Sequence, residues 1–500
     1  MPAQRKAWIP QMAAVLILGQ FARPLSAQTT QNTTISAVNY LLGSLNDAVR
    51  ARRMIAALSV TGDKDLAPFF TALASSADKE RRLAAIDTLI DLVGADAAPA
   101  LLERLQKDPA MDVRSEALLG LLKLKAVSAE QLLEAIQIPD ERVQCLAARA
   151  LVLKGQGAKA AGTLKKLAAS RSLATSSMSR MSLLGLGQTE HLPAVRAVLT
   201  DANTSPIILG LLLDQVSEEK VFAAIEPARA VAKSSLLAPV KMQAHKCVAE
   251  LSNDPPGALR EAIISSGEPV LCVLLLRVLA DRDDSQAQLK VLSAGTDVAA
   301  ALARMELARK DGGEPAAKAV AEAMALEHPI VVDYVLDRAK KDVADRGQKA
   351  DFYTASLLKY IQSVPPNPKQ MEEEHRRAAE AATLLIDLGT PAALEGMKGI
   401  LAGRYSAVTR SAAVGLLKSG NRATCELARP LLKSPYNELA TDGALALGRF
   451  GDPGASDFLC DIVARPDRHR VELLAMASWY LVKIAGQTKT AADAMAKAVK

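Results

Sequence analysis

The stretch that decides the fold runs from Val408 to Pro453, VTRSAAVGLLKSGNRATCELARPLLKSPYNELATDGALALGRFGDP. It contains two copies of one pattern, in which two small residues are followed by Leu and then by Gly: Ala412 to Gly420, and Gly443 to Gly451. A third copy runs from Ala381 to Gly389, so the copies begin at equal steps of 31 residues. A constant period between about 20 and 50 residues is typical of stacked-repeat proteins. We therefore predict a repeat protein whose units bury one another.

One unit of the repeat has the pattern of two helices. Residues 391–402 are rich in Ala and Leu, and they begin with Pro directly after Thr390, as helices often do. Residues 407–418 place apolar side chains at spacings of three and four, which is typical of an amphipathic helix. Gly420 then supplies the left-handed conformation that ends many helices. Since two short helices bury little apolar surface alone, each pair needs a neighbour.

The same pattern recurs near the N-terminus, in residues 108–121, and it is clear again in residues 444–453. The residues that carry it are Asp108-Pro109, Val113-Arg114, Ala117 and Leu121, and then ALALGRFGDP. The chain here resembles HEAT repeats, particularly the short bacterial kind related to phycobilisome-lyase repeats. The resemblance is strongest over residues 78–170 and 373–486 and weaker between them.

The resemblance implies an all-α, right-handed superhelix, a HEAT- or armadillo-like solenoid of roughly fourteen helical hairpins. It also implies that second helices line the concave face. Asp108 with Arg114, and the arginines Arg82 and Arg410 on second helices, could form a ladder of binding groups. The family resemblance implies instead that they tie neighbouring repeats together.

We divide the chain into five segments: a signal peptide (1–27), a flexible lead-in (28–37), N-terminal repeats (38–363), a Pro-rich loop (364–370) and C-terminal repeats (371–500). Prolines as close as those of the loop forbid a continuous helix. We interpret the loop as a point where the solenoid changes curvature, and a true domain boundary there is the alternative. Between residues 171 and 362 the repeat pattern weakens and the turns are irregular, as at 254–257 and 311–313.

Residues 1–27 have the layout of a secretory signal peptide. Arg5 and Lys6 precede the apolar run 12–19, which is too short to span a bilayer, and cleavage is expected after Ala27. Gln28 stands where a bacterial lipoprotein has its lipid-bearing Cys, so no lipid anchor is predicted. We expect a periplasmic or secreted protein without stable membrane insertion; a short N-terminal anchor or a first helix is the alternative.

Composition and charge agree with a helical repeat and speak against nucleic acid as a partner. Half the residues are hydrophobic but only 3% are aromatic, so the core is built from Ala and Leu. The net charge is only +6, and the basic pairs are scattered among acids, whereas phosphate binding requires a cluster. These pairs are Arg52-Arg53, Arg81-Arg82, Lys165-Lys166 and Lys340-Lys341. Residues 372–377 (EEEHRR) are interpreted as a solvated helix face, with Glu372 opposite Arg376 and Glu373 opposite Arg377, four residues apart.

No catalytic motif is present: the sequence contains no Gly-rich phosphate loop, no H-E-x-x-H and no G-x-S-x-G. Three histidines follow a glutamate, in Glu190-His191, Glu327-His328 and Glu374-His375. Deoxyhypusine hydroxylase, a HEAT-like enzyme, holds two irons with His-Glu pairs. Here the order is reversed and 137 residues separate the first two pairs, so no metal, no cofactor and no catalytic residue is predicted. A metal-dependent enzyme that uses these pairs is the alternative.

The five cysteines form no metal-binding or haem motif. Cys425 and Cys460 are the best-placed pair for a disulfide, but their registers differ by about one turn, so we favour buried free thiols. Trp479 and Tyr480 lie in an apolar helix and are predicted to pack in the core rather than to bind a saccharide.

These observations favour a non-catalytic scaffold that binds another protein or an extended peptide on the concave face. Besides the metal-dependent enzyme, a self-assembling surface or structural component is an alternative. The sequence singles out no partner-binding residue and no oligomeric state.

Overall fold

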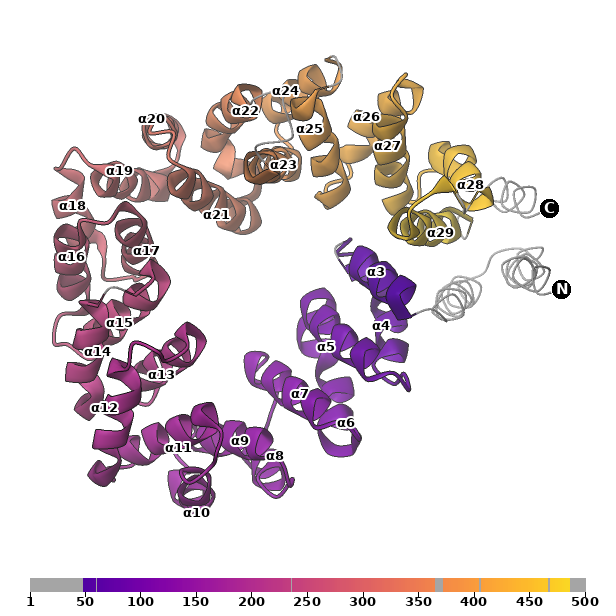
Figure 1. Ribbon diagram of the computed structural model, residues 1–500. Coiled ribbons are helices and arrows are strands. Elements are labelled where there is room, and N and C mark those ends of the chain that lie inside the picture. The colour runs from indigo at the N-terminus through magenta and orange to yellow at the C-terminus, as the bar shows by residue number, and fades with distance from the viewer. Residues whose placement is uncertain are drawn as a thin grey trace. The chain divides into compact units, whose positions relative to one another are not determined.

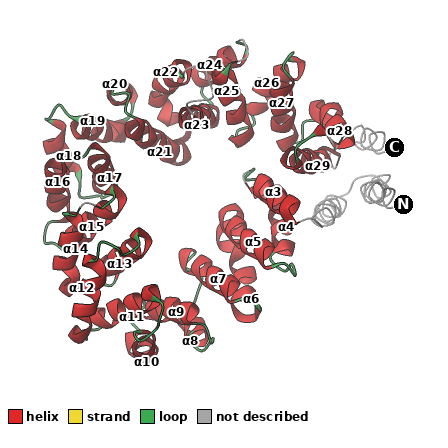
Figure 2. Ribbon diagram, viewed as in Figure 1, coloured by secondary structure: helices red, strands yellow, loops and turns green. Residues whose placement is uncertain are grey.

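The structure is a computed structural model that describes residues 48–485, except 60, 235, 365–371, 404–405 and 466–467. Within this part of the chain every regular element is a helix, and no strand is present (Figures 1 and 2). The signal peptide (1–27), the lead-in (28–37) and nearly all of the Pro-rich loop (364–370) lie outside the described residues. The prediction of an all-α fold is confirmed.

After α3 (Ala48–Ser59), the helices alternate as the first and second helix of successive hairpins. The first helices are α4 (Ala67–Leu73), α6 (Ala98–Lys107), α8 (Ala129–Ala135), α10 (Gly157–Leu167), α12 (Leu192–Thr200), α14 (Ile225–Ala232), α16 (Pro255–Ser266), α18 (Gln286–Ser293), α20 (Gly313–Met324), α22 (Thr354–Ser363), α24 (Pro391–Leu401), α26 (Thr424–Ala428) and α28 (Ser456–Ala464).

The second helices are α5 (Lys79–Val93), α7 (Met111–Lys123), α9 (Glu141–Leu153), α11 (Leu173–Gly185), α13 (Pro206–Glu218), α15 (Ala238–Glu250), α17 (Pro269–Ala280), α19 (Val298–Asp311), α21 (Pro329–Arg346), α23 (Glu372–Leu388), α25 (Ala407–Lys418), α27 (Asn437–Arg449) and α29 (Val471–Ala485). Short 3₁₀ turns adjoin several first helices: η1 (Lys64–Leu66), η2 (Gly94–Ala97), η3 (Thr189–His191), η4 (Phe222–Ala224), η5 (Gly347–Tyr353), η7 (Arg429–Lys433) and η8 (Pro453–Ala455).

The period predicted from the sequence holds along the described chain. Second helices begin 29 to 35 residues apart, except across residues 329–372, where the step is 43 and includes the Pro-rich segment. The helices predicted at 391–402 and 407–418 are α24 and α25, the second with the expected bounds. The left-handed stop predicted at Gly420 is wrong, because α25 ends at an extended Ser419 and Gly420 has no positive φ, unlike Gly389 and Gly451 in the other copies. Helices α4 to α29 make thirteen pairs, close to the roughly fourteen expected for the whole chain.

The weaker sequence pattern between residues 171 and 362 does not correspond to a break in the architecture. The proline pair at 255–256 occupies the first turn of α16, where no backbone N–H is needed, and Asp254 caps that helix by accepting from the N–H of Gly257. Gly312, with φ of +73°, lets α19 turn directly into α20. The features that look irregular in the sequence are therefore helix ends.

Small residues let the second helices of the motif approach their neighbours closely. A Cβ added to Gly415 of α25 would come within 2.7 Å of the Ala382 Cβ in α23 and 3.0 Å of a backbone nitrogen. A Cβ on Gly443 of α27 would come within 3.0 Å of the Ala428 carbonyl. Ala381, Ala382, Ala412, Ala413 and Ala444 are fully buried. The short distance between packed helices therefore explains why pairs of small residues recur in the motif.

The contacts divide the chain into two units, described separately here. Unit 2 comprises residues 98–335, and unit 1 comprises the residues up to 97 together with those from 336 onward. These boundaries differ from the division at residues 364–370 that we inferred from the prolines. In unit 2, each second helix from α7 to α19 packs against the next one.

Unit 1 is built from two stretches of chain that are far apart in sequence. Its second helices pack in the order α23, α25, α27 and α29, and α29 then packs against α3, which contacts α5 (Figure 1). The first and the last helix of the described chain are therefore neighbours in one row of helices.

Candidate interaction surfaces

The three Glu-His pairs of the sequence lie in separate hairpins. Glu190-His191 ends η3, Glu327-His328 precedes α21, and Glu374-His375 lies in α23. His328 Nδ1 accepts a hydrogen bond from the N–H of Ile330 at 3.3 Å, and His375 Nδ1 lies 3.4 Å from the Ser411 hydroxyl. Across the described residues, no group of three or more His, Cys, Asp or Glu side chains could hold a metal ion.

The arginines expected to tie neighbouring repeats together divide into two kinds. Arg82 donates to two turn carbonyls at 2.8 and 3.0 Å, and Arg114 donates to the Asp108 carbonyl at 2.6 Å. These bonds close the turn within one hairpin. A tie between neighbouring repeats stays a prediction for these residues. Arg410 does reach the next repeat, 3.9 Å from Glu438, but both side chains are largely exposed, which makes the pair weak.

The cysteines and the aromatic pair lie where we predicted. All five cysteines are free thiols, including Cys425 and Cys460, and only Cys272 is more than slightly exposed. Burial raises the pKa of the Cys460 thiol to about 11, well away from the reactive thiolate form. Trp479 and Tyr480 are buried.

The segment at residues 372–377 forms a charged helix face, as predicted, but Glu373 pairs with Arg376, three residues away, where Arg377 was expected. Arg376 pairs with Glu373 at 2.8 Å and approaches Glu380 at 3.4 Å, with the side chains of Arg376 and Glu373 about half exposed or more. Such exposed pairs contribute little stability.

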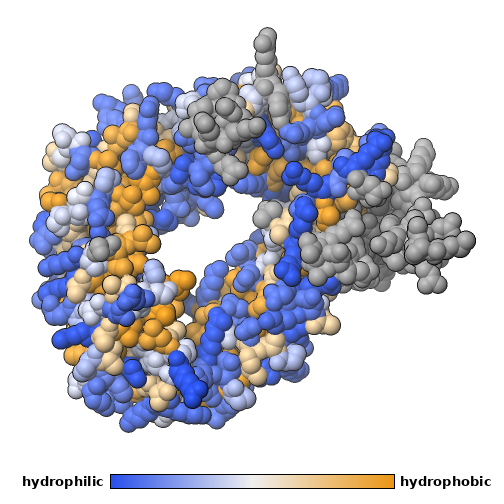
Figure 3. Space-filling model, viewed as in Figure 1, coloured by the Kyte–Doolittle hydropathy of each residue, from blue (hydrophilic) through white to orange (hydrophobic). Residues whose placement is uncertain are grey.

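A row of exposed apolar side chains lies at the start of the second helices of unit 2. It consists of Leu173 in α11, Ile207 and Leu211 in α13, Leu237 directly before α15, and Val270 in α17. Ile207 is 75% exposed and Leu237 is 67% exposed. We call these five residues the apolar row. Figure 3 shows apolar side chains gathered over α13, α15 and α17.

The apolar row is not explained by chance exposure of single residues. Isolated exposed apolar side chains are normal on proteins. Here four successive hairpins each place one at the same point, the first turn of the second helix or the residue before it. Of the second helices before this set, α5 and α9 begin with charged residues (Lys79-Glu80 and Glu141-Arg142), and α7 begins with Met111, which is partly buried. A surface feature repeated at the period of the fold suggests a repeated contact.

Backbone donors lie beside the apolar row. Helices α13, α15 and α17 all begin with Pro in the first turn and have no capping side chain, whereas α11 and α19 are capped by Ser172 and Asp297. The first N–H groups of a helix have no partner within the helix. Each proline lacks an N–H, and in α15 the N–H of Val240 already donates to the Leu237 carbonyl, so these first turns offer the few remaining N–H groups to an acceptor outside the chain.

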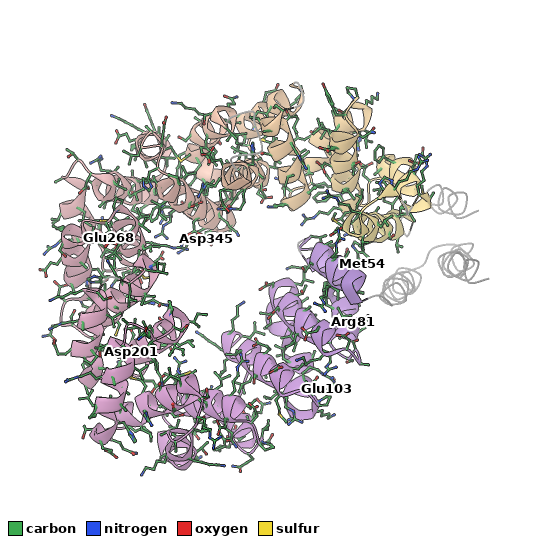
Figure 4. The ribbon with its side chains drawn as sticks, viewed as in Figure 1. Met54, Arg81, Glu103, Asp201, Glu268 and Asp345 are labelled. Atoms are coloured by element: carbon green, nitrogen blue, oxygen red, sulfur yellow. The ribbon has the colours of Figure 1, made fainter. Side chains whose placement is uncertain are left out.

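An ion pair holds two of these helix starts together. The buried Lys241 of α15 pairs through Nζ with Glu268, which lies directly before α17 and is labelled in Figure 4. The Lys241 side chain is nearly inaccessible and that of Glu268 is half exposed, and the pair links α15 to the start of α17.

A buried polar cluster near the C-terminal ends of α9, α11 and α13 joins three hairpins. Arg149 of α9 pairs with Glu218 at 2.5 Å and lies 3.4 Å from Glu219, next to the end of α13. Ser182 of α11 and Gln215 of α13 donate to Glu219 Oε1 at 3.0 and 2.8 Å. Burial raises the pKa of Glu219 to about 7, against the opposing charge of Arg149. The cluster holds α9, α11 and α13 in one arrangement.

The cavities are less informative than these surfaces. A cavity of about 630 Å³ in unit 1 is lined by Arg422, Cys425, Glu426, Arg429 and Asp452, among others. One of about 440 Å³ lies between α3 and α5 and is lined by residues of both charges. The first cavity contains one thiol, Cys425, whose pKa is raised by burial, away from the reactive thiolate form.

The apolar row was missed from the sequence. In α13, Ile207 and Leu211 look like part of an apolar helix face, yet both point outward while Leu212 is buried. The available signal was that residues 206–213 (PIILGLLL) are apolar all round, more than a helix with one buried face requires.

Comparison with known proteins agrees with the repeat architecture over the first hairpins. Residues 36–122 match the model of the HEAT-repeat family. The matched segment reaches through η1 and α4 to α7, the part of the chain in which the turns are closed by Arg82 and Arg114. No curated protein matches the chain.

Several solved structures match at low identity. The crystal structure of Kap121p matches with 12% identity and a TM-score of 0.32, covering 100% of this chain and 55% of Kap121p. UNC-45 from Drosophila melanogaster matches with 15% identity and a TM-score of 0.28, covering 99% and 77%. An engineered protein matches with 18% identity and a TM-score of 0.21, covering 83% and 98%. The chain spans about half the length of Kap121p.

One further property concerns membranes. Within the described ranges, none of the helices combines the length and the apolar character that crossing a bilayer requires.

Proposed function

We propose that this protein is a non-catalytic scaffold that binds an extended segment of another protein along the apolar row of unit 2. The observation that carries the proposal is the recurrence of an exposed apolar side chain at one structural position in four successive hairpins.

The spacing of the row suits an extended chain. Packed helices lie about 8–10 Å apart. A polyproline II segment advances about 3.1 Å per residue with three residues per turn, so every third side chain lies on one face at intervals of about 9 Å. A peptide with apolar side chains at every third residue would therefore place one beside each hairpin.

The uncapped first turns supply the polar half of the contact. An extended peptide exposes its carbonyl groups, which must be hydrogen-bonded when they are covered. The free N–H groups at the starts of α13, α15 and α17 lie beside the row and can donate to them. Side chains would then give specificity, and the backbone would add affinity.

We also propose that the protein is exported to the periplasm or secreted. Residues 1–27, with their basic start, short apolar run and small residues before Gln28, support this proposal. Sequencing the N-terminus of protein recovered from the producing cell tests it: a chain that begins at Gln28 is expected, and a chain that retains residues 1–27 would contradict it.

Selection from a library of random twelve-residue peptides tests the binding proposal directly. We expect enriched peptides to carry apolar residues at every third position. The double variant Ile207→Glu, Leu211→Glu should weaken their binding at least about tenfold, because charged groups would replace central contacts.

A matched control separates this effect from a general loss of surface apolarity. Ile264 is 66% exposed but lies on the first helix α16, outside the row, so Ile264→Glu should leave binding unchanged. Equal thermal unfolding of all variants would show that the fold is intact. Equal binding by the row variant and the control, or selection of no motif by the unmodified protein, would contradict the proposal.

A further inference from the structure

The contact between α3 and α29 joins residues about 420 positions apart. On its surface, Arg53 of α3 pairs with Glu472 of α29 through two hydrogen bonds, Nε to Oε1 at 2.6 Å and Nη2 to Oε2 at 3.0 Å. The Arg53 side chain is half exposed, so water and salt reach this pair. It is therefore the part of the contact most open to exchange with solvent.

Below the surface, the carboxylate of Asp63 is the centre of the contact. It accepts from the Trp479 indole Nε1 at 2.9 Å and from the Lys483 Nζ at 2.9 and 3.2 Å. Lys483 also pairs with Asp65 at 2.8 Å. Asp63 and Trp479 are both nearly inaccessible. The contact is thus held by charge-assisted hydrogen bonds that need both ends of the described chain to be in place.

The α29 side of this contact and the hairpin that follows α3 have support of their own, whereas α3 itself packs mainly on α29 and less on α5. Helix α29 packs on α28 and α27, and the segment after α3 packs as the hairpin of α4 and α5. Along the chain, the two sides are joined only through the 238 residues of unit 2. Separating α29 from α3 therefore breaks no bond within a hairpin.

We propose that the α3–α29 contact is a latch that opens while the hairpins on both sides stay folded. The polar groups of the contact can exchange their partners for water and counterions, whereas the buried apolar side chains of α3, such as Ile55 and Leu58, would lose cover when it opens. When it opens, Asp63, Trp479 and the facing surfaces of both helices become accessible.

Trp479 reports the state of the latch. The sequence contains two tryptophans, Trp8 and Trp479, so the full chain with Trp8→Phe has Trp479 as its one indole. In the closed latch this indole is buried and donates to Asp63. Opening should shift its emission to longer wavelength and expose it to quenching by acrylamide.

The experiment compares Trp479 fluorescence with far-UV circular dichroism during urea unfolding, at low and at high salt. We expect the fluorescence to change at lower urea than the helical signal does, and at still lower urea in high salt. Lys483→Ala should raise the open fraction about tenfold or more, because it removes a charged donor from a buried carboxylate. The helical transition should stay in place.

Two further variants keep the test decisive. Arg53→Ala removes only the half-exposed pair and should shift the fluorescence transition in the same direction without threatening the fold. Arg282→Ala removes an arginine in unit 2 that pairs with Glu250 and Asp284 at 2.8 and 2.9 Å, and it should not affect Trp479. If fluorescence and helical signal change together in all proteins and at both salt concentrations, the contact belongs to the cooperative core and is not a latch.

Discussion

Replacement of Glu219 by Gln should remove a pH dependence of stability that is specific to unit 2. The Glu219 side chain is inaccessible to water and lies among Arg149, Ser182 and Gln215. Burial raises its pKa from 4.5 to about 7, and the charge of Arg149 only partly opposes this. Gln has the same shape and can still accept from Ser182 and Gln215.

The sign and the size of the effect follow from linkage. Because the pKa is higher in the folded state, the folded protein binds a proton that the unfolded chain releases, so this group favours the fold at low pH. Its contribution is full below about pH 4.5 and is lost as the pH rises through about 7. A difference of about 2.5 pKa units corresponds to about 3 kcal/mol.

Hydrogen exchange of the α13 amides, followed by mass spectrometry between pH 5 and 8 with correction for intrinsic exchange, measures this locally. The unmodified protein should lose protection in α13 as the pH rises, and Glu219→Gln should lose much less. Asp442→Asn is the matched control, since burial raises the pKa of Asp442 in α27 of unit 1 to about 7 as well. An unchanged pH dependence of α13 in Glu219→Gln, or its loss in Asp442→Asn, would refute the reasoning.

Other predictions concern packing, caps and thiols. Gly415→Val should lower the free energy of unfolding by about 1–3 kcal/mol, because even its Cβ would clash with Ala382. Gly399 in α24 has open space around it, so Gly399→Ala should be neutral or stabilising. Thermal unfolding of both variants tests this. Asp254→Ala should lower the free energy of unfolding by about 1 kcal/mol, because it removes the cap of α16. Ser205→Ala removes no cap and should change it little. Chemical unfolding measures both, and equal losses of stability would contradict the role of the cap. Alkylation followed by mass spectrometry should modify Cys272 before the four buried cysteines, and fast modification of Cys247, whose pKa burial raises to about 12, would show that its site opens easily.

The fold was predictable from the sequence because its signals are local. The small residues that set the distance between α23, α25 and α27 recur at a fixed interval, and glycines or prolines mark the ends of their helices. One unit is enough to recognise the hairpin, and the period then gives the others. Residues 407–418 became α25 for this reason.

Features that depend on side-chain direction or on distant partners were not predictable. Whether Ile207 faces a neighbour or solvent depends on how α13 is rotated against α11 and α15, which periodicity does not determine in an all-apolar helix. Arg82 and Arg114 lie on second helices as expected, and both donate to backbone carbonyls, which carry no sequence signal. Asp63 reads as an ordinary helix cap and Lys483 as a surface lysine, and nothing in either neighbourhood indicates the other.

The packing of α29 against α3 has a practical consequence for work on this protein. In an open stack of repeats, removing the last hairpin uncovers only the hairpin before it. Here, deletion of residues 456–485 would also remove α29 from α3 and expose that surface of α3 to solvent. A C-terminal truncation should therefore destabilise the N-terminal helices as well. A truncation that removes α29 should therefore remove α3 as well.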